Sequence, residues 1–233
     1  MSVGTAPLPP AREALNTGVV TVDVVSDVVC PWCYVGKRRL EAAIEQSGEV
    51  VEVRWRPFQL DPTIPPTGLD RRTYLAGKFG DLAKLDAVHA RLTAIGAEIG
   101  IPFAFDRIAR SPNTLDAHRL IRWSSSANRQ GEIVEALFHG YFVEGLDIGD
   151  SRVLRDIAGR CGMDETLVHR LLASGSDSED VRQEIATAVR LGVSGVPFFI
   201  FAGRYAVPGA QDADVLAAAI AKARSEAPQI AEA

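Results

Sequence analysis

The sequence has no apolar run long enough to cross a membrane and no cluster of lysine and arginine that would outweigh its acidic balance. A membrane-spanning helix needs about 20 mostly apolar residues, so we expect no membrane segment. The formal net charge is -5 at pH 7 over 233 residues. An acidic chain with both signs interspersed has no electrostatic reason to bind nucleic acid or an anionic membrane. We therefore expect neither as a partner.

Cysteine is scarce, with Cys30, Cys33 and Cys161 the three in the chain. A secreted disulfide scaffold has many cysteines, usually in even number. The first eighteen residues contain three prolines and no apolar segment of the kind that a secretory signal needs. We therefore predict a flexible N-terminal tail at residues 1–18 and a cytoplasmic location.

The start of the chain has the pattern of a βαβ unit. Residues 19–26 are rich in valine, as expected of a strand buried on both faces. A helix is predicted over 32–46, and a second strand over 50–57, where apolar and polar residues alternate. Two strands joined by a helix are expected to be parallel.

The rest of the chain predicts a helical middle section and a return to the sheet. Apolar residues recur with helical spacing through the middle, most clearly over 82–99. A helix over 180–191 then leads to short β runs at 196–201 and 205–207, which should pair as a hairpin. A last helix is predicted over 212–224. The predicted fold is α/β, with a mixed four-stranded sheet flanked by helices and an all-helical domain inserted in the middle.

The sharpest chemical feature is Cys30-Pro31-Trp32-Cys33, at the predicted turn from the first strand into its helix. The unpaired N–H groups and the dipole at a helix N-terminus stabilise an anion, and the thiolate is the reactive form of cysteine. Cys30 is therefore the predicted nucleophile. Cys33, about one turn inside the helix, is placed to resolve a mixed disulfide. Pro31 suits the first turn because its missing N–H would go unused there.

A zinc site is the alternative interpretation of this cysteine pair. Structural zinc normally has four ligands, often supplied by a second pair of cysteines or histidines. The sequence has no second C-x-x-C, and its histidines occur singly along predicted helices. They are His89, His118, His139 and His169. The spacing therefore favours redox chemistry over a metal site.

A second candidate element is Val196-Pro197, at the start of the predicted strand near the end of the chain. Proline within a sheet is normally confined to an edge or to a first residue. Taken alone, this bond would be expected to be trans, because cis X–Pro bonds are uncommon. Its combination with the C-x-x-C motif reverses that expectation, and we predict a cis bond.

Five segments together resemble the DsbA-like oxidoreductases, and specifically their FrnE-like branch. The resemblance covers about residues 19–224. The segments are Asp27-Val28-Val29-Cys30-Pro31-Trp32-Cys33-Tyr34-Val35-Gly36-Lys37, Pro57-Phe58-Gln59-Leu60-Asp61-Pro62, Asn113-Thr114 with Ala117-His118-Arg119, Gly192-Val193-Ser194-Gly195-Val196-Pro197, and Gly209-Ala210-Gln211.

The resemblance implies a thioredoxin-like fold with an inserted all-helical domain. The thioredoxin-like domain would comprise residues 19–60 and 178–226, and the helical insertion residues 61–177. It also implies dithiol–disulfide exchange without a bound cofactor, acting on protein or small-molecule disulfides and dithiols. Glutathione is a candidate co-substrate, and the protein is expected to be a monomer or a homodimer.

By the same resemblance, Cys30 is the attacking thiol, Cys33 the resolving thiol and Pro197 a cis-proline that faces them. The backbone of Val196 would then pair with an extended substrate segment, as in strand addition. Trp32 occupies the position where the best-known DsbA enzymes carry histidine. Their strongly oxidising potential is therefore not carried over to this chain.

Three aromatic residues near the motif have two interpretations. Trp32, Tyr34 and Phe58 either form an apolar substrate surface around the cysteines or pack between helix and sheet. We expect Trp32 to be exposed and to contribute to substrate binding. Packing is the favoured role for Tyr34 and Phe58.

Four polar or reactive residues are weaker candidates. Asn113 and His118 could line a pocket between the domains, but a helix cap and a packed helix residue are the favoured interpretations. Asp27 is left open between assisting proton transfer from Cys33 and ending the strand by turn chemistry. Cys161, at a predicted helix end, is interpreted as a lone buried thiol.

Two other function classes compete with the redox interpretation. The 2-hydroxychromene-2-carboxylate isomerases and kappa-class glutathione transferases are similar in architecture, but typically keep a serine where Cys30 stands. The intact pair of thiols argues against that glutathione-dependent chemistry. A non-enzymatic binding module, such as a chaperone, has no positive support in the sequence.

Overall fold

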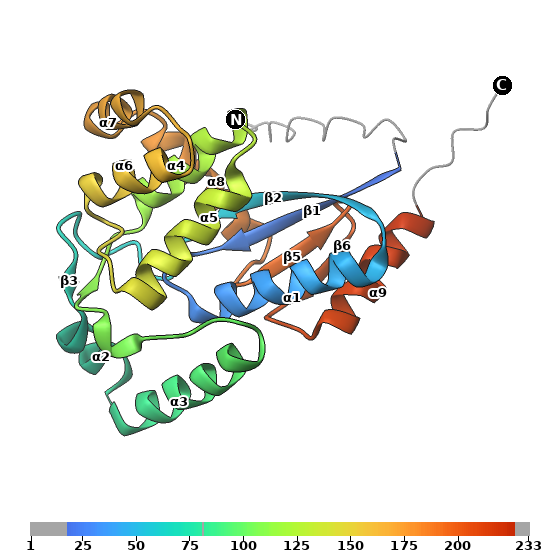
Figure 1. Cartoon of the computed structure of the whole chain (residues 1–233), viewed down its shortest axis with the longest axis horizontal. Coiled ribbons are helices and arrows are strands. Elements are labelled where there is room, and N and C mark those ends of the chain that lie inside the picture. The colour runs from blue at the N-terminus through green and yellow to red at the C-terminus, as the bar shows by residue number, and fades with distance from the viewer. Residues whose placement is uncertain (1–17, 81, 227–233) are drawn as a thin grey trace, which may run out of the picture.

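The computed structural model describes residues 18–80 and 82–226 (Figure 1). The tail predicted at residues 1–18 lies, apart from Gly18, outside the described residues. In the described part of the chain, four strands form one sheet in the order β2-β1-β5-β6. The strands are β1 (Val19–Ser26), β2 (Val50–Pro57), β5 (Phe198–Phe201) and β6 (Tyr205–Pro208). β1 is parallel to β2 and antiparallel to β5, which confirms the predicted mixed sheet.

Helices cover both faces of this sheet. α1 (Pro31–Ser47) and α9 (Ala213–Ser225) lie side by side on one face (Figure 1). Successive side chains of a strand point to opposite faces, so Val24 joins the main core while Val25 packs with Ala188 of α8 (Ser178–Arg190). The central strand β1 is therefore covered on both faces, as its valine-rich sequence predicted.

The section between β2 and α8 is mainly helical, as expected. Its helices are α2 (Arg71–Phe79), α3 (Leu82–Glu98), α4 (Leu115–Ser126), α5 (Gln130–His139), α6 (Ser151–Arg160) and α7 (Glu165–Ser174), with a 3₁₀ turn at Phe105–Arg107 and a π-helical turn at Gly140–Glu144. The section departs from an all-helical expectation in one detail, because β3 (Leu69–Asp70) and β4 (Arg110–Ser111) form a small antiparallel sheet. Strands of two residues are too short to show a two-residue period in the sequence.

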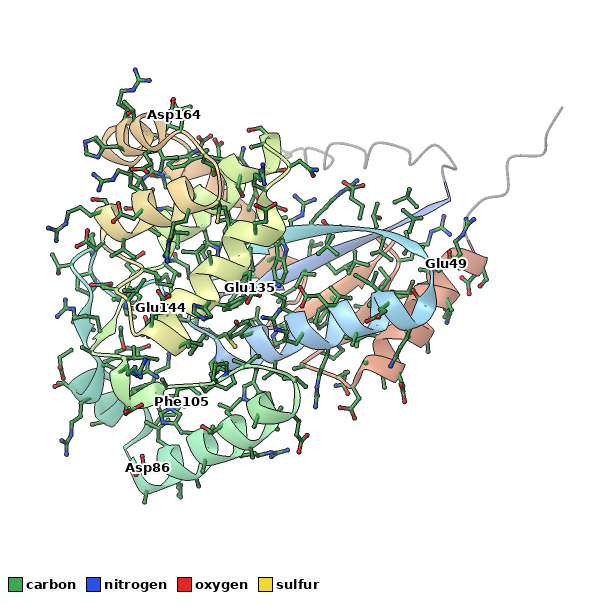
Figure 2. All side chains as sticks on the ribbon, viewed as in Figure 1. Glu49, Asp86, Phe105, Glu135, Glu144 and Asp164 are labelled. Atoms are coloured by element: carbon green, nitrogen blue, oxygen red, sulfur yellow. The ribbon has the colours of Figure 1, made fainter. Side chains whose placement is uncertain are left out.

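One carboxylate on α5 joins this helical section to α1. Glu135 lies close to α1 (Figure 2) and accepts a hydrogen bond from the Tyr34 hydroxyl at 2.7 Å. Its two oxygens lie 2.7 Å from Nζ of the buried Lys37 and 2.5 Å from Nη2 of Arg38. The Tyr34 ring stacks on Phe138 of the same helix, with ring centroids 5.0 Å apart. These contacts fix the first half of α1, the part that follows the cysteine motif.

The Glu135 cluster makes stability depend on pH. Burial by itself would raise the pKa of Glu135, but the Lys37 hydrogen bond and charge, with help from Tyr34 and Arg38, leave this pKa below its usual value. A carboxyl group with a lowered folded-state pKa stabilises the protein above its unfolded pKa, and that contribution is lost as the pH falls through the folded pKa.

We expect Glu135→Gln to lower the free energy of unfolding at pH 7 by about 2 kcal/mol, less than for a fully buried pair because the carboxylate is partly exposed. The variant should also lose less stability than the parent between pH 7 and pH values below about 4.5, where the carboxyl group of the unfolded chain protonates. Urea unfolding across that range measures both effects. Glu41→Gln, at the more exposed partner of Lys37, is the matched control and should change stability by less than about 1 kcal/mol. Equal effects of the two substitutions would contradict the prediction.

Candidate functional site

Cys30 is the residue that caps the N-terminus of α1. Its backbone is extended (φ -92°, ψ 112°), and Pro31 occupies the first turn of the helix. The Cys30 N–H donates to the Asp27 carbonyl at 3.0 Å, while the Cys30 carbonyl accepts the N–H of Cys33 at 3.0 Å. This geometry makes Cys30 the N-cap residue of α1, without a side-chain hydrogen bond to the N–H groups of the first helical turn. The helix begins within one residue of its predicted start.

Cys33 lies one turn further along and is buried completely. Its exposed fraction is 0 %, against 4 % for Cys30, and both are free thiols. Burial raises the pKa of the Cys33 thiol well above its usual value, and the neighbouring Cys30 raises it further. The Ser26 side chain and the Asp27 backbone act in the opposite direction, without overcoming the burial. Cys33 therefore rests as a protonated thiol.

The loop before β5 approaches the cysteines from the other side. The Val196–Pro197 peptide bond is cis. The Cys30 Sγ lies 3.6 Å from the Val196 carbonyl oxygen, to which it donates a weak hydrogen bond. Pro197 also lies against Gly36 of α1, where an added Cβ would come within 2.9 Å of the proline Cγ. Two segments more than 160 residues apart in sequence thus meet at one sulfur.

A cavity of about 520 Å³ opens beside Cys30. One wall, at the start of α1 and the loop before β5, is formed by Cys30, Pro31, Trp32, Gly195 and Val196. Cys33 does not border the cavity. The opposite wall is mostly apolar and comes from the helical section. Its residues include Leu60, Ile64, Leu75, Phe79, Leu85, Val88, Leu92, Pro112 and Tyr141. The cavity therefore gives the Cys30 side chain access to space large enough for a short peptide segment or a small molecule.

Cationic side chains lie among these apolar residues. Arg71, Lys78 and Lys84 all border the cavity. The Arg71 guanidinium donates to the Tyr141 hydroxyl at 2.8 Å, and the Lys78 ammonium donates to the Tyr74 hydroxyl at 2.8 Å. These groups come from α2 and α3 and were not among the sequence candidates. α2 has no buried residue, so its sequence carries no apolar stripe that would have indicated a helix at this place.

Comparisons with known proteins agree with this geometry. Residues 21–221 match the family model of the DSBA-like thioredoxin domain. The protein belongs to this DsbA-like family. It is 30 % identical over 202 residues to the uncharacterized protein YwbO of Bacillus subtilis, a match that covers 86 % of this chain and 96 % of that one. The crystal structure of a probable DsbA oxidoreductase, SCO1869 of Streptomyces coelicolor, is 32 % identical, covers 92 % of this chain and 94 % of its own, and has a TM-score of 0.82.

Two more distant structures share the fold of the DsbA-like chain. A 2-hydroxychromene-2-carboxylate isomerase is 20 % identical with a TM-score of 0.67, covering 87 % of this chain and 95 % of its own. The cytosolic disulfide reductase DsbM of Pseudomonas aeruginosa, solved with GSH, is 21 % identical with a TM-score of 0.58, covering 88 % of this chain and 96 % of its own. At this level of identity the likeness concerns architecture alone, and the same architecture carries different chemistries.

The aromatic residues near the motif of the DsbA-like protein divide into two groups. Tyr34 and Phe58 are buried, which confirms the packing role favoured for both. Trp32 is half-buried rather than exposed, so that expectation is wrong. The Arg91 guanidinium of α3 lies over its indole ring, 5.8 Å from the centroid. The sequence did not show that α3 folds back over the start of α1.

Asn113 and His118 have different outcomes. Thr114, and not Asn113, is the N-cap residue of α4, so the cap role favoured for Asn113 is wrong by one residue, whereas the packed position favoured for His118 is observed. The Asn113 side chain accepts the Leu115 N–H at 3.0 Å at the start of α4, and donates to the Ile64 carbonyl at 2.6 Å. His118 is buried within α4, and its Nε2 lies 3.4 Å from Oδ1 of Asp27. Asn113 is not among the residues that border the Cys30 cavity.

Asp27 and Cys161 complete the set of predicted residues. Asp27 is buried, its carbonyl accepts the Cys30 N–H, and its Oδ2 accepts the Leu60 N–H at 2.7 Å. The turn role is therefore present. Cys161 caps the end of α6 as a free, half-buried thiol, and burial is the main cause that raises its pKa.

Within residues 18–80 and 82–226, no group of three or more His, Cys, Asp and Glu side chains is arranged to hold a metal ion. In the same residues, no helix combines the length and the apolar character that crossing a bilayer requires.

The contact between Gly36 and Pro197 predicts a stability effect. Gly36→Ala places a methyl group 2.9 Å from the proline Cγ and 3.1 Å from the Phe199 ring. We expect it to lower the free energy of unfolding by about 1–3 kcal/mol, as overpacking does. Gly77→Ala, where no atom lies within 4 Å of the new methyl group, is the matched control and should stabilise by up to about 1 kcal/mol. Urea unfolding compares them, and a neutral Gly36→Ala would contradict the close approach.

The unequal burial of the two sulfurs predicts unequal reactivity. In a Cys161→Ser background, Cys33→Ser leaves Cys30 as the single thiol and Cys30→Ser leaves Cys33. We expect iodoacetamide at pH 7 to alkylate Cys30 at least about tenfold faster, because complete burial raises the pKa of Cys33 and denies the reagent access to it. The two variants should react at similar rates in denaturant. Equal rates in the folded proteins would contradict the assignment of nucleophile and resolving thiol.

Proposed function

We propose that this protein is a thiol–disulfide oxidoreductase of the FrnE-like branch that works through a mixed disulfide on Cys30. The observation that carries the proposal is the position of Cys30, between the N-terminus of α1, the Val196 carbonyl and a cavity of about 520 Å³. Cys33 lies behind it and has no access to that cavity. This arrangement suits one thiol that meets substrate and a second that meets only the first.

The proposed reaction has two exchange steps. The Cys30 thiolate attacks a substrate disulfide, so that a bond forms between Cys30 and one substrate sulfur while the substrate S–S bond breaks. The departing thiolate takes a proton from solvent. Cys33 then loses its proton and attacks the Cys30 sulfur, which forms the Cys30–Cys33 disulfide and releases the second substrate thiol. Two electrons pass from the protein to the substrate, and the reverse sequence oxidises a dithiol.

Substrate recognition is proposed to combine the backbone of Val196 with the cavity. Main-chain pairing beside cis-Pro197 would hold an extended segment with little dependence on its sequence. Trp32 and the apolar wall would receive a side chain next to the substrate sulfur. Protein disulfides and small disulfides, glutathione disulfide among them, are the proposed substrates. We propose a core of residues 19–60 and 178–226 and a helical insertion of residues 61–177, and the residues that border the cavity come from both ranges.

The isomerase or transferase chemistry of the 2-hydroxychromene-2-carboxylate isomerase and kappa-class type is the alternative. That chemistry does not require a second thiol, whereas Cys33 here is held beside Cys30 by the first turn of α1. Isomerase activity that survives the loss of both thiols would favour the alternative.

Insulin reduction with dithiothreitol tests the proposal. We expect Cys30→Ser to lower the rate at least about 100-fold, because no other thiol meets the cavity. Cys33→Ser should accumulate a mixed disulfide with glutathione or with a peptide, visible by mass spectrometry and reversed by reductant. Cys161→Ser is the control and should act as the parent does.

A Cys30→Ser variant as active as the parent would end the proposal. A Cys33→Ser variant that turns over normally and traps nothing would remove Cys33 from the mechanism.

A further inference from the structure

The resolving step raises a problem of proton transfer. Cys33 must lose a proton before it attacks Cys30, yet its exposed fraction is 0 % and it does not border the substrate cavity. When substrate occupies that cavity, the direct path past Cys30 is also blocked. A buried acid that ionises during turnover needs hydrogen-bonding groups that reach solvent by another path.

Ser26 is the first group on such a path. It is the last residue of β1 and is buried, with its side chain approaching the Cys33 thiol and lowering the pKa of that thiol. Its Oγ has no hydrogen-bond partner among the described residues. Since buried polar atoms are nearly always satisfied, an unpartnered hydroxyl at this place indicates an ordered water or a functional role.

A small cavity of about 10 Å³ lies between Ser26 and His118 of α4. That volume is about the space occupied by one water molecule. His118 Nε2 is buried and, like Ser26 Oγ, has no hydrogen-bond partner in the described part of the chain. A water here would meet a hydroxyl on one side and an imidazole on the other, which are groups that can both give and accept a proton.

His118 also borders a larger cavity of about 390 Å³ on its other side. The exposed residues Arg122, Ser125 and Ser126 line that second cavity. None of them borders the substrate cavity beside Cys30. His118 thus borders two cavities. One is the small cavity next to Ser26, with room for one water molecule, and the other is a surface cavity outside the proposed substrate site.

We propose that Ser26, one water and His118 conduct the proton of Cys33 to and from the second cavity during disulfide exchange. The inference rests on the proposed function. As Cys33 attacks Cys30, its proton passes to the Ser26 hydroxyl, which gives its own proton to the water, which in turn protonates His118. The imidazolium then releases a proton to solvent. When the Cys30–Cys33 disulfide is reduced, the proton travels the opposite way.

The charges around His118 suit this role. Asp27 Oδ1 lies 3.4 Å from Nε2 and has no other partner among the described residues, so a carboxylate oxygen faces the imidazole. Two guanidinium groups share cavities with His118 and would oppose its positive charge. Both are held by carboxylates, Arg56 by Asp23 and Arg122 by Glu184, Asp177 and Asp180. α5 contributes only uncharged groups to these cavities, from Gln130 and Val134.

A two-step colour reaction separates the relay from the nucleophile. An aromatic disulfide that releases a coloured thiolate is mixed with the reduced protein in a Cys161→Ser background. The first equivalent of colour reports attack by Cys30, and the second reports attack by Cys33 on the mixed disulfide. We expect His118→Ala and Ser26→Ala to slow the second release at least about tenfold, the lower range of proton-transfer effects, and to leave the first unchanged.

Rescue distinguishes a proton carrier from a packing residue. Imidazole added to His118→Ala should restore most of the second release, because the surface cavity next to the deleted ring can admit it. It should not affect Ser26→Ala. His169→Gln, on the exposed face of α7, is the matched histidine control and should behave as the parent does.

The outcomes separate this inference from the proposed function. No first release from the parent protein would overturn the function itself. Two releases from the parent, with a second release that is unchanged in the variants, would overturn only the relay. A slowed second release that imidazole does not restore would assign His118 a packing role and also overturn the relay. If His118→Ala does not fold, Ser26→Ala, which deletes one buried atom, provides the test. An unchanged rate of the second thiolate release in that variant would overturn the relay.

Discussion

The complete burial of the Cys33 sulfur is the constraint on which the rest of the site depends. A thiol in an apolar interior remains protonated and unreactive, so it can take part in exchange only after a covalent bond to Cys30 has formed. Its place one turn inside α1 sets the distance to Cys30 through ordinary helix geometry. Glu135 contacts three side chains of that helix, in addition to the packing of α1 on α9 and on Pro197.

The two parts of the chain contribute differently to the chemistry. The sheet and its helices place Cys30, Cys33 and Pro197 by backbone geometry, which depends little on particular side chains. The helical section adds the wall of the cavity and the cations within it. One fold can carry different chemistries, and in this chain the helical section supplies the part of the cavity that the sheet does not.

The core could be predicted from sequence because its signals are local. β1 and β2 have the bounds that their valine-rich and alternating patterns predicted, and α1 ends at Gly48 in the left-handed conformation that commonly ends helices. The C-x-x-C motif needs only this local geometry to define its two thiols. The cis bond before Pro197 was expected only from its combination with that motif.

The far side of the site could not be predicted because it depends on packing between distant segments. α2 buries no residue and leaves no periodic pattern. Trp32 was expected to be exposed, since nothing in its neighbourhood of the sequence shows that Arg91 would lie over its ring. The proximity of Asp27 to His118 likewise joins residues about 90 positions apart, and each of them alone had a simpler structural interpretation.

The recessed position of Cys30 has a consequence for the kind of disulfide that can react. The sulfur is nearly covered and opens into a space of about 520 Å³ rather than onto a flat surface. A disulfide embedded in a rigid globular surface cannot be brought to that depth without a clash of the two backbones. If the proposed exchange takes place, it would be restricted to sulfurs on flexible segments of chain or on small molecules. The entrance would then select substrates by their local flexibility rather than by their sequence.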